Sequence, residues 1–188
     1  MTIHPLPRVK LTYQDYVSLP DDGLRHEVLD GELFMSAAPV PYHQLVVMRL
    51  SFQLQGAIGE AGLGLVFGSP PTVQLGEHDI LEPDITVLMN DRRQLLTPKK
   101  IKGAPNLVIE VLSPSTRRRD RGIKKDRCSS HGVPEYWLVD PDEHLVEQWL
   151  LRDGDYVLQG TFAERALARM RARCRDRPAA PLVTVTPW

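Results

Sequence analysis

Apolar positions along the chain fall into short runs separated by glycine and proline, a pattern typical of compact strands with few helices. The apolar pairs on either side of Asp30-Gly31 predict a β-hairpin over 26–36, because this dipeptide favours a tight two-residue turn. The run 107–112 is apolar except for one residue and predicts a central strand buried on both faces. The other predicted elements are a helix over 11–19 capped by Thr12, strands over 63–67, 72–75, 84–89 and 136–139, a helix over 117–131, and a hairpin of 145–151 with 156–159.

The longest amphipathic stretch is residues 42–58, which predicts a helix. Leu45, Met48 and Phe52 follow the helical spacing and are expected near one face, and Leu50, Leu54 and Ile58 join them in a wide apolar stripe. We therefore expect this face to belong to the apolar stripe that the helix buries.

The order of the elements predicts a single α/β (α+β) domain with a mixed central β-sheet flanked by helices. The turn 76–79 is expected to join the strands 72–75 and 84–89. This domain is expected to cover residues 1–162. Residues 163–188 are rich first in arginine and alanine and then in proline, so we expect a basic C-terminal tail, either an exposed helix or a segment without fixed structure.

Charge is segregated along the chain, although its sum is small. The 188 residues carry a formal net charge of -1, from 23 basic and 24 acidic side chains. Residues 117–127 nevertheless hold seven basic and two acidic groups, and residues 163–177 hold six basic and two acidic groups. The near-zero sum therefore does not exclude a nucleic-acid partner, because basic segments stand against a mostly acidic body.

Several classes of protein are excluded by what the sequence lacks. No apolar run is long enough to span a membrane, and the N-terminus lacks the apolar core of a signal peptide, so we expect a cytoplasmic protein. Two cysteines make no disulfide framework, and neither CxxC nor HExxH is present to suggest zinc. No Gly-x-Ser-x-Gly elbow supports a serine hydrolase, and Cys128 has no evident base beyond His131.

Two acidic residues, Glu110 and Asp84, are candidates for a functional site because of their positions in the predicted strands. Glu110 lies in the middle of the apolar run 107–112, so it needs either a basic partner or a metal ion. Asp84 follows Pro83 and opens the next strand upstream. If the two strands are neighbours, Asp84 and Glu110 converge, and two oxygen ligands that leave several waters in place are typical of Mg²⁺ sites.

Lys124 is the candidate cation for this pair. It shares a helical face with Asp120 and Cys128, at a spacing of four residues. One interpretation is a lysine placed over the two carboxylates, where it stabilises negative charge on a phosphate. The other is a solvated basic helix, and the adjacent Lys125 is the alternative lysine.

The stretch LVIEVLSPSTRRRDRGIKKDRCSSHGVPEYWLVDP resembles the Uma2-type endonucleases, a branch of the PD-(D/E)XK nuclease superfamily. Upstream, RHEVLDGELF resembles the family's first hairpin, YHQLVVMRL resembles its long helix, and EPDITVL contains the Pro-Asp pair that names the superfamily. The likeness covers roughly residues 10–160. SPST followed by GVPEYW at this spacing is specific, whereas a Pro-Asp pair alone is weak evidence.

The resemblance implies a role for each motif residue. Asp84, Glu110 and the backbone carbonyl of Val111 would bind Mg²⁺, with Mn²⁺ as an alternative. Glu27 and His43 would approach the same site from the hairpin and the helix. The superfamily's lysine stands two residues after the glutamate, where this chain has a leucine, so Lys124 resembles a lysine that has migrated to the following helix.

The resemblance also implies a nucleic-acid partner, expected to be DNA, and a homodimer. The residues expected to contact backbone phosphates are Arg117, Arg118, Arg119, Arg121 and Lys125.

Three hypotheses follow. The first is a Mg²⁺-dependent endonuclease that hydrolyses phosphodiester bonds in DNA, with Asp84, Glu110 and Lys124 as its catalytic residues. The second is a protein with the nuclease fold that binds nucleic acid and cuts it weakly or not at all. The third is a purely structural ion network formed by the same three residues. A metal effect on melting temperature and cleavage of plasmid DNA separate them.

Overall fold

We analysed a computed structural model, which describes residues 9–163. Its helical elements, in chain order, are α1 (Tyr13–Val17), α2 (Pro41–Leu54), the π-helical η1 (Gln55–Gly59), the 3₁₀-helical η2 (Asn90–Leu95), α3 (Arg117–Arg121) and α4 (Ile123–Ser130). Its strands are β1 (Arg25–Leu29), β2 (Glu32–Ser36), β3 (Gly64–Phe67), β4 (Val73–Gly76), β5 (Asp79–Leu81), β6 (Ile85–Met89), β7 (Ile101–Lys102), β8 (Leu107–Val111), β9 (Glu135–Asp140), β10 (Leu145–Arg152) and β11 (Asp155–Ala163).

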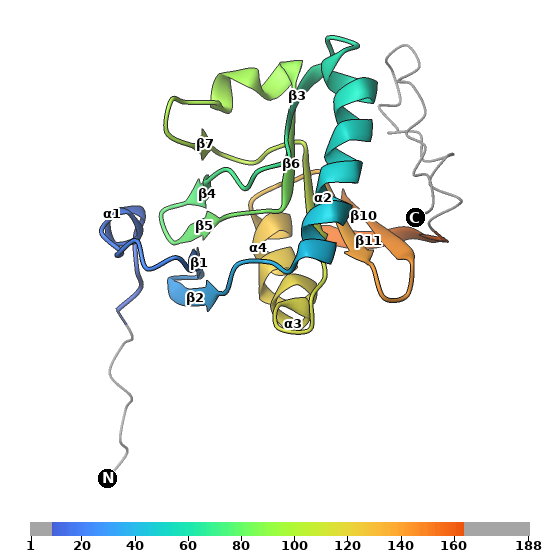
Figure 1. Ribbon diagram of the computed structural model, residues 1–188. Coiled ribbons are helices and arrows are strands. Elements are labelled where there is room, and N and C mark those ends of the chain that lie inside the picture. The colour runs from blue at the N-terminus through green and yellow to red at the C-terminus, as the bar shows by residue number, and fades with distance from the viewer. Residues whose placement is uncertain (1–8, 164–188) are drawn as a thin grey trace.

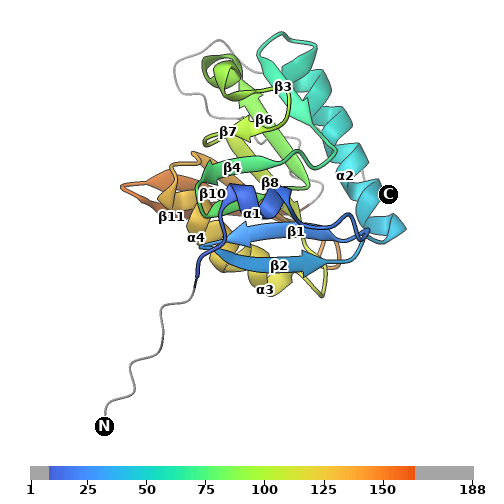
Figure 2. The same ribbon diagram turned by 90° about the vertical axis from the view of Figure 1, so that its left-hand side faces the viewer.

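The strands form two mixed sheets. The larger has the order β11-β10-β9-β8-β6-β3, and the smaller has the order β2-β1-β5-β4-β7. The larger sheet is central: Figure 1 shows α2 on one side of the β3–β6 pair and the smaller sheet on the other. In Figure 2 the smaller sheet faces the viewer, and α1 lies beside β1. The predicted mixed α/β domain is confirmed, with a second sheet in addition to the expected central one.

Strand β8 shows why the central sheet has two apolar faces. Ile109 and Val111 join the core cluster that packs under α2. Val108 and Leu112 join the cluster on the opposite face, with Cys128 of α4. Glu110 shares the second face by the alternation of side chains along a strand. The strand therefore directs a carboxylate toward α4 from the middle of the sheet.

A parallel pairing fixes the place of α3 and α4. Strands β8 and β9 run parallel, from the pair Leu107–Glu135 to the pair Val111–Val139. Parallel neighbours need a crossover connection, and here that crossover carries the SPST turn and the two short helices. The crossover brings α4 back over the face of β8 that carries Glu110.

Only part of the apolar stripe predicted for α2 is buried. Leu50 and Leu54 are buried as predicted, in a row with positions 43 and 47, whereas Met48 and Phe52 are 61% and 79% exposed. Apolar residues occur on most sides of this helix, so the sequence pattern alone defines no single face. The sheet selects the row that begins with His43.

Two further element predictions were wrong in detail. The helix expected over 117–131 breaks at Gly122, which lies between α3 and α4 with φ -108° and ψ -114°, outside the helical region. The turn 76–79 leads from β4 into β5, which pairs with β1, and not directly into β6. The short β5 is followed by Pro83, which separates it from β6.

The expected tail, residues 163–188, lies outside the described residues, apart from Ala163 at the end of β11. Over the described range, 9–163, no helix has the length and apolar character needed to cross a bilayer.

Candidate active site

The antiparallel register of β6 and β8 brings the two predicted carboxylates together. Ile85 pairs with Ile109, so Asp84, one residue before β6, falls opposite Glu110. Asp84 Oδ2 accepts a hydrogen bond from the backbone N–H of Val111 at 2.9 Å. The condition set by the sequence is therefore met: the two strands are neighbours, and both side chains line one cavity.

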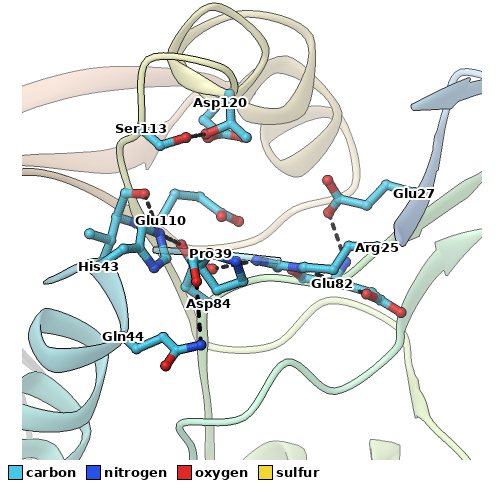
Figure 3. A network of polar contacts seen from close by, with 12 residues as sticks. Arg25, Glu27, Pro39, His43, Gln44, Glu82, Asp84, Glu110, Ser113 and Asp120 are labelled. Carbon is cyan, nitrogen blue, oxygen red and sulfur yellow. Dashed lines mark hydrogen bonds and ion pairs between the residues drawn. The ribbon is translucent and has the colours of Figure 1, made fainter. Parts of the chain in front are cut away.

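Asp84 is held by groups from two other elements (Figure 3). Arg25 of β1 donates from Nη1 to Asp84 Oδ1 at 2.9 Å. His43 of α2 places Nε2 2.8 Å from the Val111 carbonyl oxygen and 3.2 Å from Asp84 Oδ2. Since a carbonyl oxygen can only accept, His43 carries a proton on Nε2. Asp84 is thus fixed as an ionised carboxylate.

Lys124 lies between two carboxylates and is fully buried. Its Nζ is 2.6 Å from Glu110 Oε1 and 2.8 Å from Glu27 Oε1, and these carboxylates are 2% and 1% exposed. Asp120 Oδ1 lies at 4.0 Å, so the break at Gly122 leaves Asp120 and Lys124 on one side of the crossover. Lys125, the alternative lysine, points its Nζ at the ring of Trp149, 3.6 Å from the ring centroid. The contact with Glu110 therefore belongs to Lys124.

Arg119 adds a second cation beside Glu27. Its Nη2 lies 3.1 Å from Glu27 Oε2, and its Nε donates to Asp120 Oδ1 at 3.3 Å. Glu27 also accepts the backbone N–H of Glu82 at 2.8 Å. Glu27 is thus a junction between the first hairpin, the strand leading to Asp84 and the crossover helices.

The buried charges do not balance. Four carboxylates are at least nineteen-twentieths buried, those of Glu27, Asp84, Glu110 and Asp120, and the cations facing them are Lys124, Arg25 and Arg119. Each cation is within ion-pair distance of at least one of these carboxylates. Lysine and arginine are thus one fewer than the carboxylates, and the imidazole of His43, 3.2 Å from Asp84 Oδ2, is a further group beside the cluster.

The pKa values of Glu110, Asp84 and Lys124 are set by burial and by the charges around them. Burial, together with the charges of Asp84, Asp120 and Glu27, raises the pKa of Glu110 well above its usual range against the opposing effect of Lys124. Burial would also raise the pKa of Asp84, but the hydrogen bond from His43 and the charge of Arg25 lower it to about 2. Burial would lower the pKa of Lys124, and the charges of Glu110 and Glu27 raise it instead. Lys124 is a permanent ammonium at neutral pH.

A cavity of about 270 Å³ opens onto this cluster. Its wall includes Asp84, Glu110, Asp120 and Arg119, with the SPST turn and the segment that leads into α2 on other sides. Figure 3 shows Ser113 and Asp120 on one side of Glu110, and His43 and Asp84 on the other. The carboxylates are therefore buried in the fold yet reachable from one hollow.

The donor atoms beside this cavity suit a hard cation. Within residues 9–163 no three His, Cys, Asp or Glu side chains form a metal-binding group by themselves. The candidate ligands are two carboxylates, from Asp84 and Glu110, and the carbonyl of Val111, which are the oxygen donors that Mg²⁺ prefers when it retains several waters. Asp84 Oδ2 and the Val111 oxygen already converge on one polarised N–H, that of His43.

A model of the Uma2 family, described as "Putative restriction endonuclease", matches residues 13–172. The chain belongs to the Uma2 family. The match includes the first hairpin, the long helix, the strand that follows Asp84 and the crossover, so it covers every element that carries a candidate site residue.

Two known proteins resemble this Uma2 chain. An uncharacterized protein of Synechocystis sp., slr1290, is 28% identical over 161 residues, which are 81% of this chain and 80% of the relative. A crystal structure of a "putative nuclease belonging to DUF820" from Anabaena variabilis superposes with a TM-score of 0.66 at 22% identity, over 79% of this chain and 83% of the other. The structural likeness supports the fold.

The five side chains expected to contact nucleic acid fall into two groups. Arg118 is exposed on α3, and Arg119 lines the cavity. The other three already have protein partners: Arg117 donates to both oxygens of Asp140, Arg121 donates to Glu147 Oε1, and Lys125 lies over Trp149. The sequence could not show that Arg118 is exposed while Arg117 and Arg121 bind acidic residues of β9 and β10.

The sequence analysis missed Arg25 as a site residue. It donates to Asp84 and to the Glu82 carbonyl, and its Nε lies 3.8 Å from Glu82 Oε2. A signal was present, because Arg25 stands two residues before Glu27 in the stretch that resembles the family's first hairpin, and along a strand this spacing places both side chains on one face. Asp120 was noted only as part of a helical face, and the structure places it in the wall of the cavity.

Proposed function

We propose that this Uma2 protein is a Mg²⁺-dependent endonuclease that hydrolyses phosphodiester bonds in DNA. The observation that carries the proposal is the Lys124 ammonium, 2.6 Å from Glu110 in a cluster that also contains Asp84 and that opens onto a cavity. Family membership supports the same class of reaction. Paired carboxylates can bind the metal ion that activates water, and a permanent cation beside them can stabilise the negative charge that develops on the phosphate.

A Mg²⁺ ion held by Asp84, Glu110 and the Val111 carbonyl would polarise the phosphate and lower the pKa of a water nucleophile, and Mn²⁺ takes the same donors. The chain's own contribution is to hold these ligands in place. The Val111 N–H, His43 and Arg25 fix the orientation of Asp84, while Lys124 fixes that of Glu110. Carboxylates outnumber lysine and arginine in the cluster, and this favours the binding of a cation.

Lys124 acts as a fixed positive charge in this proposal. Its raised pKa means that it does not accept a proton at neutral pH, so it is not the general base. Its ammonium stabilises negative charge as it develops on the phosphate oxygens and helps to orient the attacking water. Because it also contacts Glu27, its position is set from two sides.

Arg119 is the arginine best placed to bind the phosphate. It lines the cavity, whereas Arg117 and Arg121 are engaged by Asp140 and Glu147. Arginine presents five N–H donors, and the contacts of Arg119 with Glu27 and Asp120 use two of its three nitrogens. The remaining donors are available to a phosphate oxygen, and the exposed Arg118 extends the basic surface along α3.

The proposal is tested by cleavage of plasmid DNA with Mg²⁺ or Mn²⁺ and by its loss in EDTA. We expect Glu110→Gln and Asp84→Asn each to reduce the rate at least about a hundredfold, with circular dichroism to confirm folding. Asp21→Asn, the same carboxylate-to-amide change at an exposed position, is the matched control and should retain activity. Undiminished cleavage by a folded Glu110→Gln protein contradicts the proposal, and binding without cleavage by the wild type favours the nucleic-acid-binding alternative. RNA of the same sequence tests the choice of DNA.

A further inference from the structure

A second, larger cavity adjoins the candidate active site. Its volume is about 660 Å³, and Arg25, Pro39, His43 and Asp84 belong to the walls of both cavities. The remaining walls are α2 on one side and the segment between β3 and β4 on the other, and Glu82 also lines the cavity. The four shared residues thus form a boundary, with the Glu110 cluster on one side and the larger hollow on the other.

The larger cavity differs chemically from the acidic one. Val47 and Met48 of α2 and Pro70 of the opposite segment give it apolar walls. Gln44 and Ser69 are exposed at its surface and carry hydrogen-bonding groups. Figure 3 shows Gln44 on α2, on the opposite side of Asp84 from Ser113 and Asp120. Apolar walls with a few polar groups at the edge suit a flat heteroaromatic ring.

The width of this cavity is fixed by a close approach between its two walls. A Cβ atom on Gly68 would lie 2.2 Å from Ser51 Oγ, so only glycine lets the segment pass the helix at this distance. Ser51 Oγ is itself held, since it donates to the Val47 carbonyl at 2.7 Å. The hollow is therefore bounded by two elements in direct contact, and its volume lies within the range of ligand-binding pockets.

Arg25 stands where the two cavities meet. Its Nη1 binds Asp84, and its Nη2 donates to the Glu82 carbonyl. Each of these nitrogens carries a second hydrogen, so the guanidinium keeps donors for a phosphate oxygen while it holds Asp84. A phosphodiester at this boundary would have the carboxylate cluster on one side and the apolar hollow on the other.

We propose that the larger cavity binds one unstacked nucleoside of the DNA strand, next to the phosphate that is cut. This inference rests on the proposed function and adds the class of substrate. A base inside a duplex is stacked on both faces, and it enters such a pocket only after it has left the stack. The protein therefore prefers single-stranded or locally unpaired DNA to a fully paired duplex.

The preference is measured as binding, by fluorescence anisotropy of a labelled oligodeoxynucleotide with wild-type protein, in EDTA and in Ca²⁺. The three probes are a single strand, the paired duplex, and the same duplex with a short unpaired bubble. Since stacking of one base contributes about five- to 150-fold in affinity, we expect the single strand and the bubble to bind about tenfold more tightly than the duplex.

Two variants of α2 locate the preference in the cavity. Met48→Glu and Phe52→Glu make the same change on exposed apolar side chains of one helix, and only Met48 lines the cavity. Met48→Glu should remove the preference for unpaired DNA, and Phe52→Glu should leave it unchanged. Ser69→Trp, at an exposed position on the opposite wall, should also remove it.

Equal affinity for the three probes overturns the inference, as does an equal effect of the two glutamate variants or the absence of any binding. These outcomes are distinguishable from failure of the proposed function. A protein that prefers unpaired DNA and never cuts it retains this inference and loses the nuclease proposal. A protein that cuts all three forms equally, without a binding preference, retains the nuclease proposal and loses this inference.

Discussion

The ammonium of Lys124 lies 2.6 Å from Glu110 Oε1, and both side chains are withdrawn from solvent. A buried ion pair is costly to break, because removing one partner leaves the other charged in a medium of low dielectric. The same ammonium serves Glu27, so one lysine compensates two carboxylates from β1 and β8. Its removal has consequences for stability that can be separated from consequences for catalysis.

Lys124→Met is expected to lower the free energy of unfolding at pH 7 by about 3–5 kcal/mol. Burial already raises the pKa of Glu110, and in this variant Glu110 loses the opposing charge of Lys124 and its pKa rises further, while Glu27 keeps Arg119 as its cation. The lost stability should therefore return partly as the pH falls and Glu110 takes up a proton. Urea denaturation at several pH values measures this. Lys125→Met is the control and should cost only about 0.5–1 kcal/mol, since it loses one cation–π contact with Trp149. Equal losses for the two lysines would contradict the burial of Lys124.

Added Mg²⁺ or Mn²⁺ is expected to raise the melting temperature of the wild-type protein. A ligand that binds only the folded state stabilises it by about 2.7 kcal/mol at one hundred times its dissociation constant, and EDTA should reverse the effect. Glu110→Gln and Asp84→Asn should abolish the response, because each removes a proposed ligand. If the wild-type melting temperature does not change at saturating metal, the cluster is a structural ion network.

Asp79 should make stability depend on acid pH. Burial would raise the pKa of Asp79, but hydrogen bonds from Arg127, the Asp30 N–H and His131 hold it below its usual range. A depressed folded-state pKa gives stability that is present above the unfolded value, about 3.9, and is lost as the pH falls through the folded-state value.

Asp79→Asn is therefore expected to cost about 1.5–3 kcal/mol at pH 7 and progressively less below pH about 4. Denaturation of the wild type and the variant at pH 7, 4 and 3 gives the comparison. Asp21→Asn, at an exposed position, should behave as the wild type at each pH. A constant difference between the Asp79→Asn protein and the wild type across this range would speak against the ionised carboxylate.

The buried face of α2 can be tested by two truncations. Leu50→Ala removes a fully enclosed side chain and should cost about 2–5 kcal/mol. Phe52→Ala removes an exposed ring and should change stability by no more than about 0.5 kcal/mol. Chemical denaturation distinguishes them, and the reverse order would contradict the burial of Leu50 and the exposure of Phe52.

Much of the candidate site was predictable because strand alternation and motif spacing constrain it. Glu110 is costly within an apolar strand, so the sequence required a partner for it, and the structure supplies Lys124. The convergence of Asp84 and Glu110 was predicted only on the condition that their strands are neighbours, and β6 does pair with β8. The roles of Glu27 and His43 came only from the resemblance. The structure places Glu27 beside Lys124 and His43 beside Asp84.

The features that could not be predicted concern residues of the same type whose surroundings differ in the fold. Apolar side chains surround α2, and only the sheet beneath it decides that Leu50 is buried and Phe52 is not. Arg117, Arg119 and Arg121 are equivalent in sequence, and their roles differ because Asp140, Glu27 and Glu147 lie at different places around α3. Gly122 divides a stretch whose helical spacing gave no sign of a break.

The bridge from Glu27 through Lys124 to Glu110 joins the first hairpin to a helix near the end of the domain. During synthesis, β1 and β8 leave the ribosome before α4, so both carboxylates are made before their shared cation. A partial chain that ends before α4 therefore cannot close the site. If the protein cuts DNA, its destructive activity is withheld until α4 has been made, and this delay follows from the order of the elements alone.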